Sequence, residues 1–327
     1  MWQIYFCHIF LINYLKILTQ KMILFLTTQI SPSSDGMMHI FAERKIPVFR
    51  LNMDMFNSYN FLWDHEHFEI INPSGLICNS AEVSCVICYH ARMTVDQHFQ
   101  NIDLYGGENK WVVSWLNHLH DCFVAFGNDS KILRLFAPVG MFYSKTLQMN
   151  RALKYFAVPN YYLHFGRKLA KNSVIVKSLT QRPFSDGSTM YAKIIDQADL
   201  DSKWPWFTQD IADGNRDATV LYINGKVHCY QFATERGNLT DWRITQGTEA
   251  NQWIPWDAGK EFEGKIDLYM KDIGLKFGRL DFIIGGKEPQ FLEVNPVGQF
   301  GWLDDENLTL HNEVVDAILD PSSTITL

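Results

Sequence analysis

Three oxygen-bearing side chains near the C-terminus have the types and the spacing of a metal site. The stretch is GRLDFIIGGKEPQFLEVNPVGQFGWLD, residues 278–304. Asp281 lies inside the apolar run LDFII, and Glu293 and Asn295 are two residues apart in FLEVN, so both leave the same face of a strand. A turn at residues 285–286 brings the two strands side by side. We expect Asp281, Glu293 and Asn295 to bind Mg²⁺, which takes few protein carboxylates and uses nucleotide phosphates for its remaining positions.

The alternative is that Asp281 and Glu293 are ordinary charges on an edge strand. Each sits within apolar residues that bury its backbone, and a buried carboxylate is costly in free energy unless it is paired or bound to a metal. We therefore favour the metal site. Asn295 is neutral, so it serves as an oxygen ligand and not as a base.

The N-terminal part of the chain has the pattern of a βαβ unit. An apolar strand is expected over residues 22–28, a loop at SPSSDG, a helix over 37–45 and a second strand over 46–52. A hairpin follows over 68–79, turning at Pro73-Ser74-Gly75, and a strand over 83–92 ends at Arg92. Apolar residues with a 3.6-residue period predict a helix over 108–120.

The C-terminal part reads mainly as antiparallel strands. A helix is expected over 145–156, a strand over 173–179 and several strands after residue 206. Asn224-Gly225, between VLYI and KVHCYQF, is the strongest hairpin signal in the chain. The class is thus α/β, with α+β character in the C-terminal lobes.

Composition narrows the class of function. The 327 residues suffice for two or three packed lobes, and 47% of them are hydrophobic. A net charge of -7 argues against nucleic acid or an anionic membrane as partner.

Cys85 and Cys88 form a lone CxxC without a second ligand pair, which favours buried thiols over a zinc or redox site. His118 and His120 also lack partners. No disulfide framework is indicated, so a reducing cytoplasm is expected.

Residues 1–21 are apolar but do not form a clear membrane span. Lys16, His8 and Asn13 interrupt the run, and a spanning helix needs about 20 apolar residues. A signal peptide fits poorly, because a basic start and a small-residue cleavage site are missing. We expect Met22 to be the natural start and residues 1–21 to be an extension; a peripheral amphipathic helix is the alternative.

The stretch FLEVNPVGQFGWL, downstream of Asp281, resembles the metal-binding end of ATP-grasp enzymes. It is specifically similar to the graspetide synthetases, such as the microviridin ligases, which crosslink side chains of ribosomal peptides. The likeness extends from Met22 to about Leu319. It implies an ATP-grasp fold with an N-terminal βαβ pre-ATP-grasp domain over 22–130, a central lobe over 131–206 and a C-terminal lobe with the metal site over 207–327.

The resemblance also implies which residues bind ATP and two Mg²⁺ ions. Lys177 in SVIVKSL would contact the α/β-phosphates, and Arg243 in TDWRI would reach the phosphates; these two are the expected catalytic cations. FTQDI resembles the hinge that holds adenine by backbone bonds, and PFSDGSTM stands in the place of the glycine loop. Lys145, at the start of a helix, is a further expected nucleotide contact. The remaining cofactor-binding residues are Ser185, Gly187, Gln209, Asp210 and Ile211.

Three departures from the family pattern concern the phosphates and the substrate. Asp217 or Ala218 stands where relatives carry an Arg-Val pair. His90-Ala91-Arg92 replaces a double arginine. The glycine loop holds only Gly187, and a sparse loop gives fewer bare backbone N–H groups for phosphate.

The resemblance implies an ADP-forming ligase that activates a carboxylate as an acyl phosphate and joins it to an amine or hydroxyl. The expected partner is a precursor peptide with a leader and an acidic core, steered by Arg92, Arg182 and Arg216; nucleic acid and membrane are not expected, and a homodimer stays open. Two alternatives remain. One is a ligase that adds amino acids to a protein or small carboxylate, and the other is an ATP-binding protein without turnover.

Overall fold

The computed structural model describes residues 21–64, 67–92, 109–137, 144–166, 173–177, 192–235 and 252–327. The chain divides into two compact units, one of Met1–Arg134 with Glu306–Leu327 and one of Leu135–Asp305. The four domain ranges expected from the sequence stay predictions. No helix in the described ranges has the length and apolar character needed to cross a membrane.

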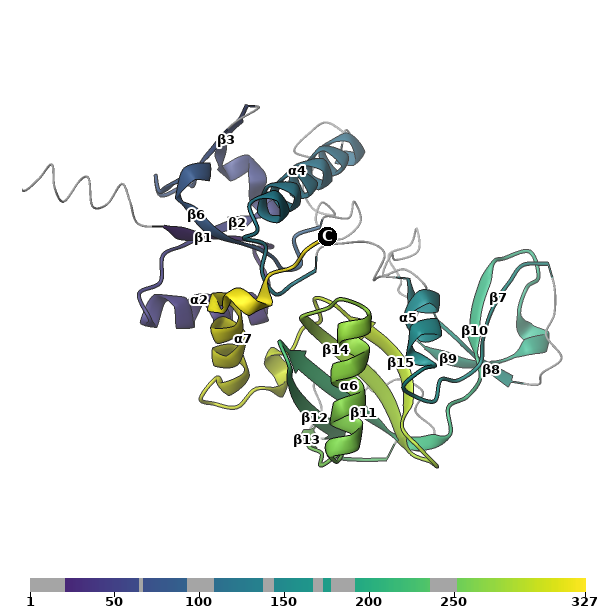
Figure 1. Ribbon diagram of the computed structural model, residues 1–327. Helices are drawn as coiled ribbons and strands as arrows, with labels where there is room; N and C mark the ends of the chain where they lie inside the picture. Colours follow the sequence, from purple (N-terminus) through teal and green to yellow (C-terminus); the bar gives the residue numbers. More distant parts are fainter. Residues whose placement is uncertain are drawn as a thin grey trace, which may run out of the picture. The chain divides into compact units, whose positions relative to one another are not determined.

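The first unit is built on a parallel sheet with strand order β2-β1-β6 (Figure 1). β1 (Met22–Thr27), α2 (Pro32–Glu43) and β2 (Val48–Asn52) form the predicted βαβ unit, in which β1 pairs in parallel with β2 and with β6 (Val83–Cys88). The expected strand to Arg92 ends earlier, because His90 has a left-handed φ of 54° that interrupts an extended chain.

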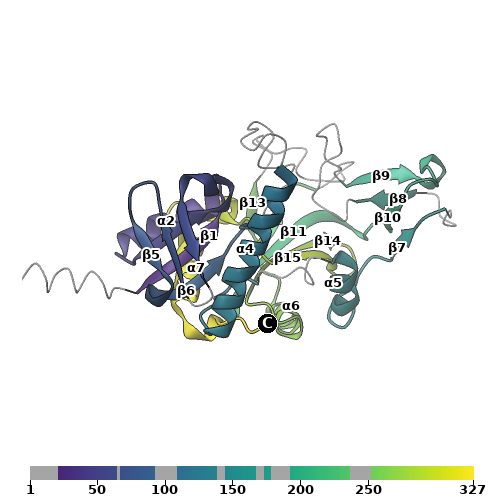
Figure 2. The ribbon, with the colours of Figure 1, turned by 90° about the horizontal axis from the view of Figure 1, so that it is seen from above.

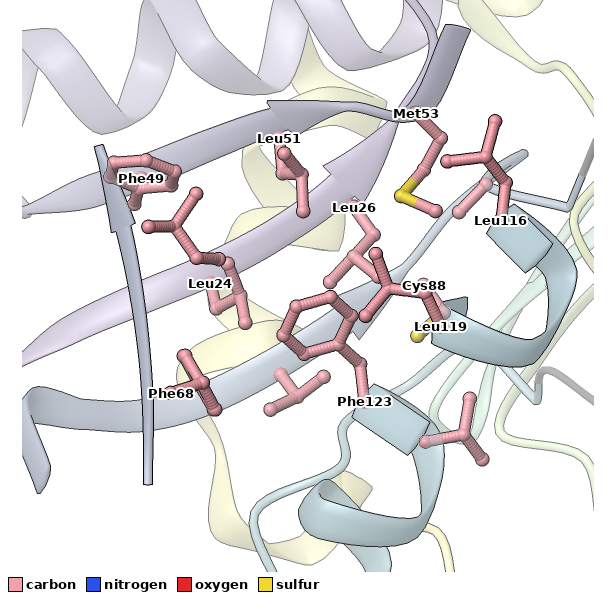
Figure 3. Packing of buried hydrophobic residues seen from close by; sticks show 14 of the residues in the cluster. Leu24, Leu26, Phe49, Leu51, Met53, Phe68, Cys88, Leu116, Leu119 and Phe123 are labelled. Carbon is pink, nitrogen blue, oxygen red and sulfur yellow. The ribbon is translucent and has the colours of Figure 1, made fainter. Parts of the chain in front are cut away.

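A small antiparallel sheet and two helices complete this unit. β3 (Asn60–Trp63), β4 (Phe68–Ile71) and β5 (Ile77–Asn79) form the sheet, and the predicted turn before β5 is present, with φ of 86° at Gly75. α4 (Asn109–Asp129) is longer than predicted. Figure 3 shows its Leu116, Leu119 and Phe123 packed with Leu24 and other buried side chains of the sheet. The last helix is α7 (Thr309–Leu319).

α2 begins five residues earlier than predicted. Its first residue is Pro32, which tolerates the first helical position because its missing N–H would have no helical partner there. Gly36 lies within α2 where α7 approaches closely: a Cβ at this position would lie 2.5 Å from Cδ2 and Nε2 of buried His311. The expected loop SPSSDG is therefore the first turns of a helix whose glycine makes room for a neighbour.

The second unit contains two antiparallel sheets. The five-stranded sheet has the order β13 (Trp253–Pro255), β12 (Lys226–Phe232), β11 (Gly214–Ile223), β14 (Phe277–Gly285), β15 (Gln290–Asn295). The four-stranded sheet has the order β7 (Tyr161–His164), β10 (Trp206–Gln209), β8 (Ser173–Val176), β9 (Lys193–Asp196). The hairpin predicted at Asn224-Gly225 is confirmed, with positive φ of 45° and 98° at the two turn residues.

Two helices bury one face and one edge of the five-stranded sheet. α6 (Lys260–Asp272) packs Ile266, Tyr269 and Met270 against the apolar side of the strands. α5 (Lys145–Ala152) lies beside β15 in both views (Figures 1 and 2). The helix expected to reach residue 156 ends at Ala152, after which the chain turns so that Ala157 pairs with Gln290.

Gly36→Ala should lower the free energy of unfolding by about 1–3 kcal/mol, because the added methyl group overlaps the His311 ring. Gly264→Ala is the matched control, since Gly264 is also helical but its Cβ would meet nothing within 4 Å. That change should stabilise by roughly 0.5–1 kcal/mol. Urea unfolding measures both values.

The His311→Ala background identifies the cause. There, Gly36→Ala should destabilise much less, because the ring is gone. An equal loss in both backgrounds would contradict a steric conflict between α2 and α7.

Candidate active site

Two neighbouring strands place the predicted metal ligands on one face of the five-stranded sheet. β14 and β15 are antiparallel, with Asp281 opposite Glu293 and Arg279 opposite Asn295. Side chains that lie directly opposite in such a pair share a face, and residues two apart on one strand do so as well. The opposite face carries Leu280 and other core residues that pack against α6. Hence the structure brings together all three predicted ligands.

A β-bulge makes this arrangement possible. Phe282 lies opposite Phe291 while Asp281 lies opposite Glu293, so β15 has one extra residue, Leu292, at this point. In a regular strand Phe291 and Glu293 would point to the same side. The bulge lets Phe291 stay in the core while Glu293 faces the polar side, and bulges commonly re-aim side chains next to active sites.

Asp281 is surrounded by three polar partners. Thr219 on β11 donates its hydroxyl to Asp281 Oδ1 at 3.0 Å, and Arg279 Nη2 and Asn295 Nδ2 approach Oδ2 at 3.3 and 3.4 Å. Burial raises the pKa of the Asp281 carboxyl; Arg279 opposes this shift, and the carboxylate of Glu293 adds to it. The site therefore holds two neighbouring carboxylates, and the negative charge of Glu293 makes ionisation of Asp281 less favourable.

Glu293 is held by cations. Lys145, the first residue of α5, lies with Nζ 2.8 Å from Glu293 Oε2. Burial alone would raise the pKa of Glu293, but Lys145 and Lys177 outweigh it and lower that pKa to about 2. Lys145, a predicted nucleotide-binding lysine, thus contacts a predicted metal ligand, and the charge of Lys177 also favours the ionised form of Glu293.

The residues expected to hold the adenine lie at the end of β10. Gln209 is buried within the strand, whereas Ile211 is 52% exposed. The backbone N–H of Asp210 donates to the carbonyl of Asn160 at 2.8 Å, so that particular donor is already engaged in the protein. Lys177 directly follows β8, and β8 pairs with β10. The hinge and Lys177 thus belong to one sheet, and their roles toward ATP stay predictions.

The remaining predicted site residues lie on the opposite face of the sheet, in the first unit or outside the described residues. Arg216 on β11 lies opposite Ile284 in the pairing with β14. Ile284 belongs to the core that packs against α6, so Arg216 lies on the face of the sheet opposite Asp281. There its Nη1 donates to Gln231 Oε1 at 3.3 Å. Arg92 belongs to the first unit and pairs with Asp121 at 3.6 Å. The predictions for Arg182, Ser185, Gly187 and Arg243 fall outside the described residues.

Sequence reasoning missed two members of the site, Arg279 and Thr219. Arg279 stands two residues before Asp281, and this spacing alone could have placed it on the same face. Its guanidinium also donates to the carbonyl of Gln299 at 3.1 Å and lies 5.6 Å from the ring centre of Trp302. Thr219 could not have been found, because its contact with Asp281 depends on the register between β11 and β14.

The cysteines and histidines of the two sequence pairs differ in their exposure. Cys85 and Cys88 are buried on β6, and burial raises the pKa of the Cys85 thiol to about 12, so it carries little reactive thiolate. His120 is buried with Asp121 as partner, whereas His118 is exposed. The parts of the chain described here contain no cluster of three or more His, Cys, Asp or Glu residues that could hold a metal ion, and the predicted magnesium ligands include only two such residues together with Asn295.

Comparison with solved structures shows that the chain has the ATP-grasp fold that the sequence predicted. A RiPP-associated ATP-grasp ligase of Chryseobacterium gregarium, solved with ADP and a leader and core peptide, matches with a TM-score of 0.74 and 17% identity, over 94% of this chain and 100% of that one. The macrocyclase MdnC of Microcystis aeruginosa MRC, bound with precursor peptide MdnA, matches with a TM-score of 0.70 and 17% identity, over 91% and 99%.

A further solved structure matches the chain with a lower TM-score. D-alanine–D-alanine ligase of Bacillus anthracis matches with a TM-score of 0.51 and 11% identity, over 92% of this chain and 97% of that one. No protein-family profile and no curated protein sequence matches the chain. At these identities the similarity defines the fold, and the site residues must carry the chemistry.

Asp281→Asn should raise the thermal stability of the protein in EDTA, because it removes one of two partly buried carboxylates that face each other across the strands. The same change should abolish the stabilisation that Mg²⁺ and AMPPNP give to the unchanged protein, since binding to the native state stabilises it. Thermal melts with and without the ligands measure both effects. A variant that is destabilised in EDTA, yet still stabilised by Mg²⁺ and AMPPNP, would show that Asp281 is a fold residue.

Proposed function

We propose that this protein is an ATP-dependent, ADP-forming ligase that activates a side-chain carboxylate as an acyl phosphate. The observation that carries the proposal is the single polar face on which Asp281, Glu293 and Asn295 lie together, with Lys145 and Lys177 acting on Glu293. Acidic ligands beside paired cations suit the transfer of a phosphoryl group, which depends mainly on positioning and charge neutralisation.

The donor set fits magnesium. Two carboxylates and an amide oxygen from adjacent strands are hard oxygen ligands, and the Asn295 amide turns its Nδ2 toward Asp281, which leaves Oδ1 for a cation. We infer that Asp281, Glu293 and Asn295 hold the two Mg²⁺ ions expected for this fold. When bound, Mg²⁺ neutralises charge on the β- and γ-phosphates.

The chain's own cations complete the charge balance. Lys145 and Lys177 place two ammonium groups near Glu293, where they can move to phosphate oxygens. Arg279 stays beside Asp281 and keeps that carboxylate oriented. An acceptor carboxylate oxygen attacks the γ-phosphorus and ADP leaves; an amine or hydroxyl then attacks the acyl carbon, phosphate leaves, and the proton passes to solvent.

A ribosomal precursor peptide is the substrate we favour. The structures of the Chryseobacterium ligase and of MdnC hold leader and core or precursor peptides, and they cover nearly all of this chain. By this proposal the peptide has a leader and an acidic core, and Arg92 and Arg182 steer it, with the charge-dependent part weakened by salt. Arg216, the third arginine expected to steer the core, lies on the face opposite Asp281 and is left out of this proposal. A cytoplasmic location belongs to the same proposal, and a homodimer stays open.

Mass spectrometry tests the proposal directly. The protein is incubated with ATP, Mg²⁺ and an acidic peptide encoded beside its gene. Each crosslink should remove one water from the peptide and release one ADP. Glu293→Gln should slow this reaction by about 100-fold or more, the factor for loss of roughly 3 kcal/mol of transition-state stabilisation.

Glu288→Gln is the matched control, since Glu288 is exposed in the loop between β14 and β15. This variant should keep the rate within about twofold, as surface changes away from a site usually do. Gain of amino-acid mass by the peptide would favour the amino-acid-adding ligase. ATP binding without any mass change would favour the non-catalytic alternative, and normal turnover by Glu293→Gln would refute the metal assignment.

A further inference from the structure

A buried glutamine on α5 binds the backbone between the two β15 ligands. Gln148 is 6% exposed, and its Nε2 donates to the carbonyl of Val294 at 2.8 Å. The N–H of Val294 donates in return to Gln148 Oε1 at 3.1 Å. Both ends of one side-chain amide are therefore used on one residue, and that residue separates Glu293 from Asn295.

The position of Val294 explains why such a contact is needed. β15 is the last strand of its sheet, and in the described residues its side away from β14 is paired with backbone only at its start, where Ala157 bridges to Gln290. The N–H and C=O of Val294 face away from β14, toward α5, and a buried backbone group without a partner is costly in free energy. A glutamine amide has the donor and the acceptor of a peptide group. Gln148 thus takes the place of the missing next strand for this one residue.

The same helix holds the Glu293 side chain. Lys145 and Gln148 are three residues apart, so they lie on the same face of α5. Lys145 contacts the carboxylate of Glu293, while Gln148 fixes the backbone of the following residue. The hydroxyl of Tyr269 on α6 donates to the Gln148 carbonyl at 3.3 Å, and this contact links α5 to α6.

We propose that Gln148 is a positioning residue for the metal and nucleotide site. It fixes the position of α5 along β15, so that Lys145, Glu293 and Asn295 keep the same positions relative to one another. Apolar packing of α5 comes from Met149 and Ala152, which belong to the core, and Gln148 adds a polar contact with β15. The inference rests on the proposed function, because it concerns the site at which Mg²⁺ and ATP would bind.

Gln148→Met keeps the length of the side chain but removes both hydrogen bonds. The affinity for Mg²⁺ in the presence of AMPPNP, measured by calorimetry, should fall by about 10–100-fold, as is typical when residues that orient metal ligands are changed. Hydrogen exchange at the Val294 amide should become at least about tenfold faster, since its acceptor is lost. In assays of turnover, the Mg²⁺ requirement should rise more than the KM for peptide.

Gln197→Met is the matched control. Gln197 is also a buried glutamine of the second unit, 4% exposed, and it lies in the short helix Gln197–Asp199 after β9. Its replacement should leave Mg²⁺ affinity and Val294 exchange within about twofold of the unchanged protein, as expected for a distant, independent site. Gln148→Glu is a second variant, because it retains an acceptor for Val294 N–H but loses the donor to Val294 C=O.

The outcomes separate this inference from the function. If Val294 exchange accelerates in Gln148→Met but Mg²⁺ affinity stays within twofold, Gln148 serves the fold only and the inference is wrong. If the Val294 amide of the unchanged protein exchanges as fast as a free edge amide, the contact itself is refuted even if neither variant folds. If the unchanged protein binds no Mg²⁺ with AMPPNP while its Val294 amide is protected, the proposed function has failed instead.

Discussion

The site depends on the pairing of β14 with β15, which sets two carboxylates opposite each other on the polar face of a sheet. Asp281 and Glu293 would repel one another in this register, and burial strengthens the effect. The surrounding structure offsets that repulsion with cations: Arg279 beside Asp281, and Lys145 and Lys177 near Glu293. Such a cluster is poorly suited to stability alone and well suited to exchanging its partners for a metal ion and phosphates.

The remaining elements of the second unit hold this pair in place. α6 packs against the apolar face, so the polar face is left for chemistry. The bulge at Leu292 keeps Phe291 in the core while turning Glu293 to the opposite side. α5 closes the edge of β15 through Gln148 and also provides Lys145. Core packing and ligand geometry are therefore set by the same few backbone contacts, and we expect changes in either to affect the other.

Much of the fold and of the candidate site could be predicted from the sequence, because local residue patterns set it. The remainder depends on contacts between segments that are far apart in the chain. Asn224-Gly225 fixed a hairpin because few other dipeptides adopt two positive φ values. FLEVN identified Glu293 and Asn295 because local spacing sets their face. The contact of Thr219 with Asp281, by contrast, depends on register between strands far apart in sequence. The close approach of Gly36 on α2 to His311 on α7 likewise depends on a contact between segments far apart in sequence, which no local pattern contains.

Diffraction from crystals grown with Mn²⁺ and AMPPNP would test the central claim most directly. Mn²⁺ accepts the same hard oxygen ligands as Mg²⁺ and gives an anomalous signal. We expect a peak about 2.0–2.3 Å from oxygens of Asp281, Glu293 and Asn295, with Lys145 turned from Glu293 toward phosphate. Nucleotide bound with no peak at these three residues, and with Lys145 still paired to Glu293, would contradict the account.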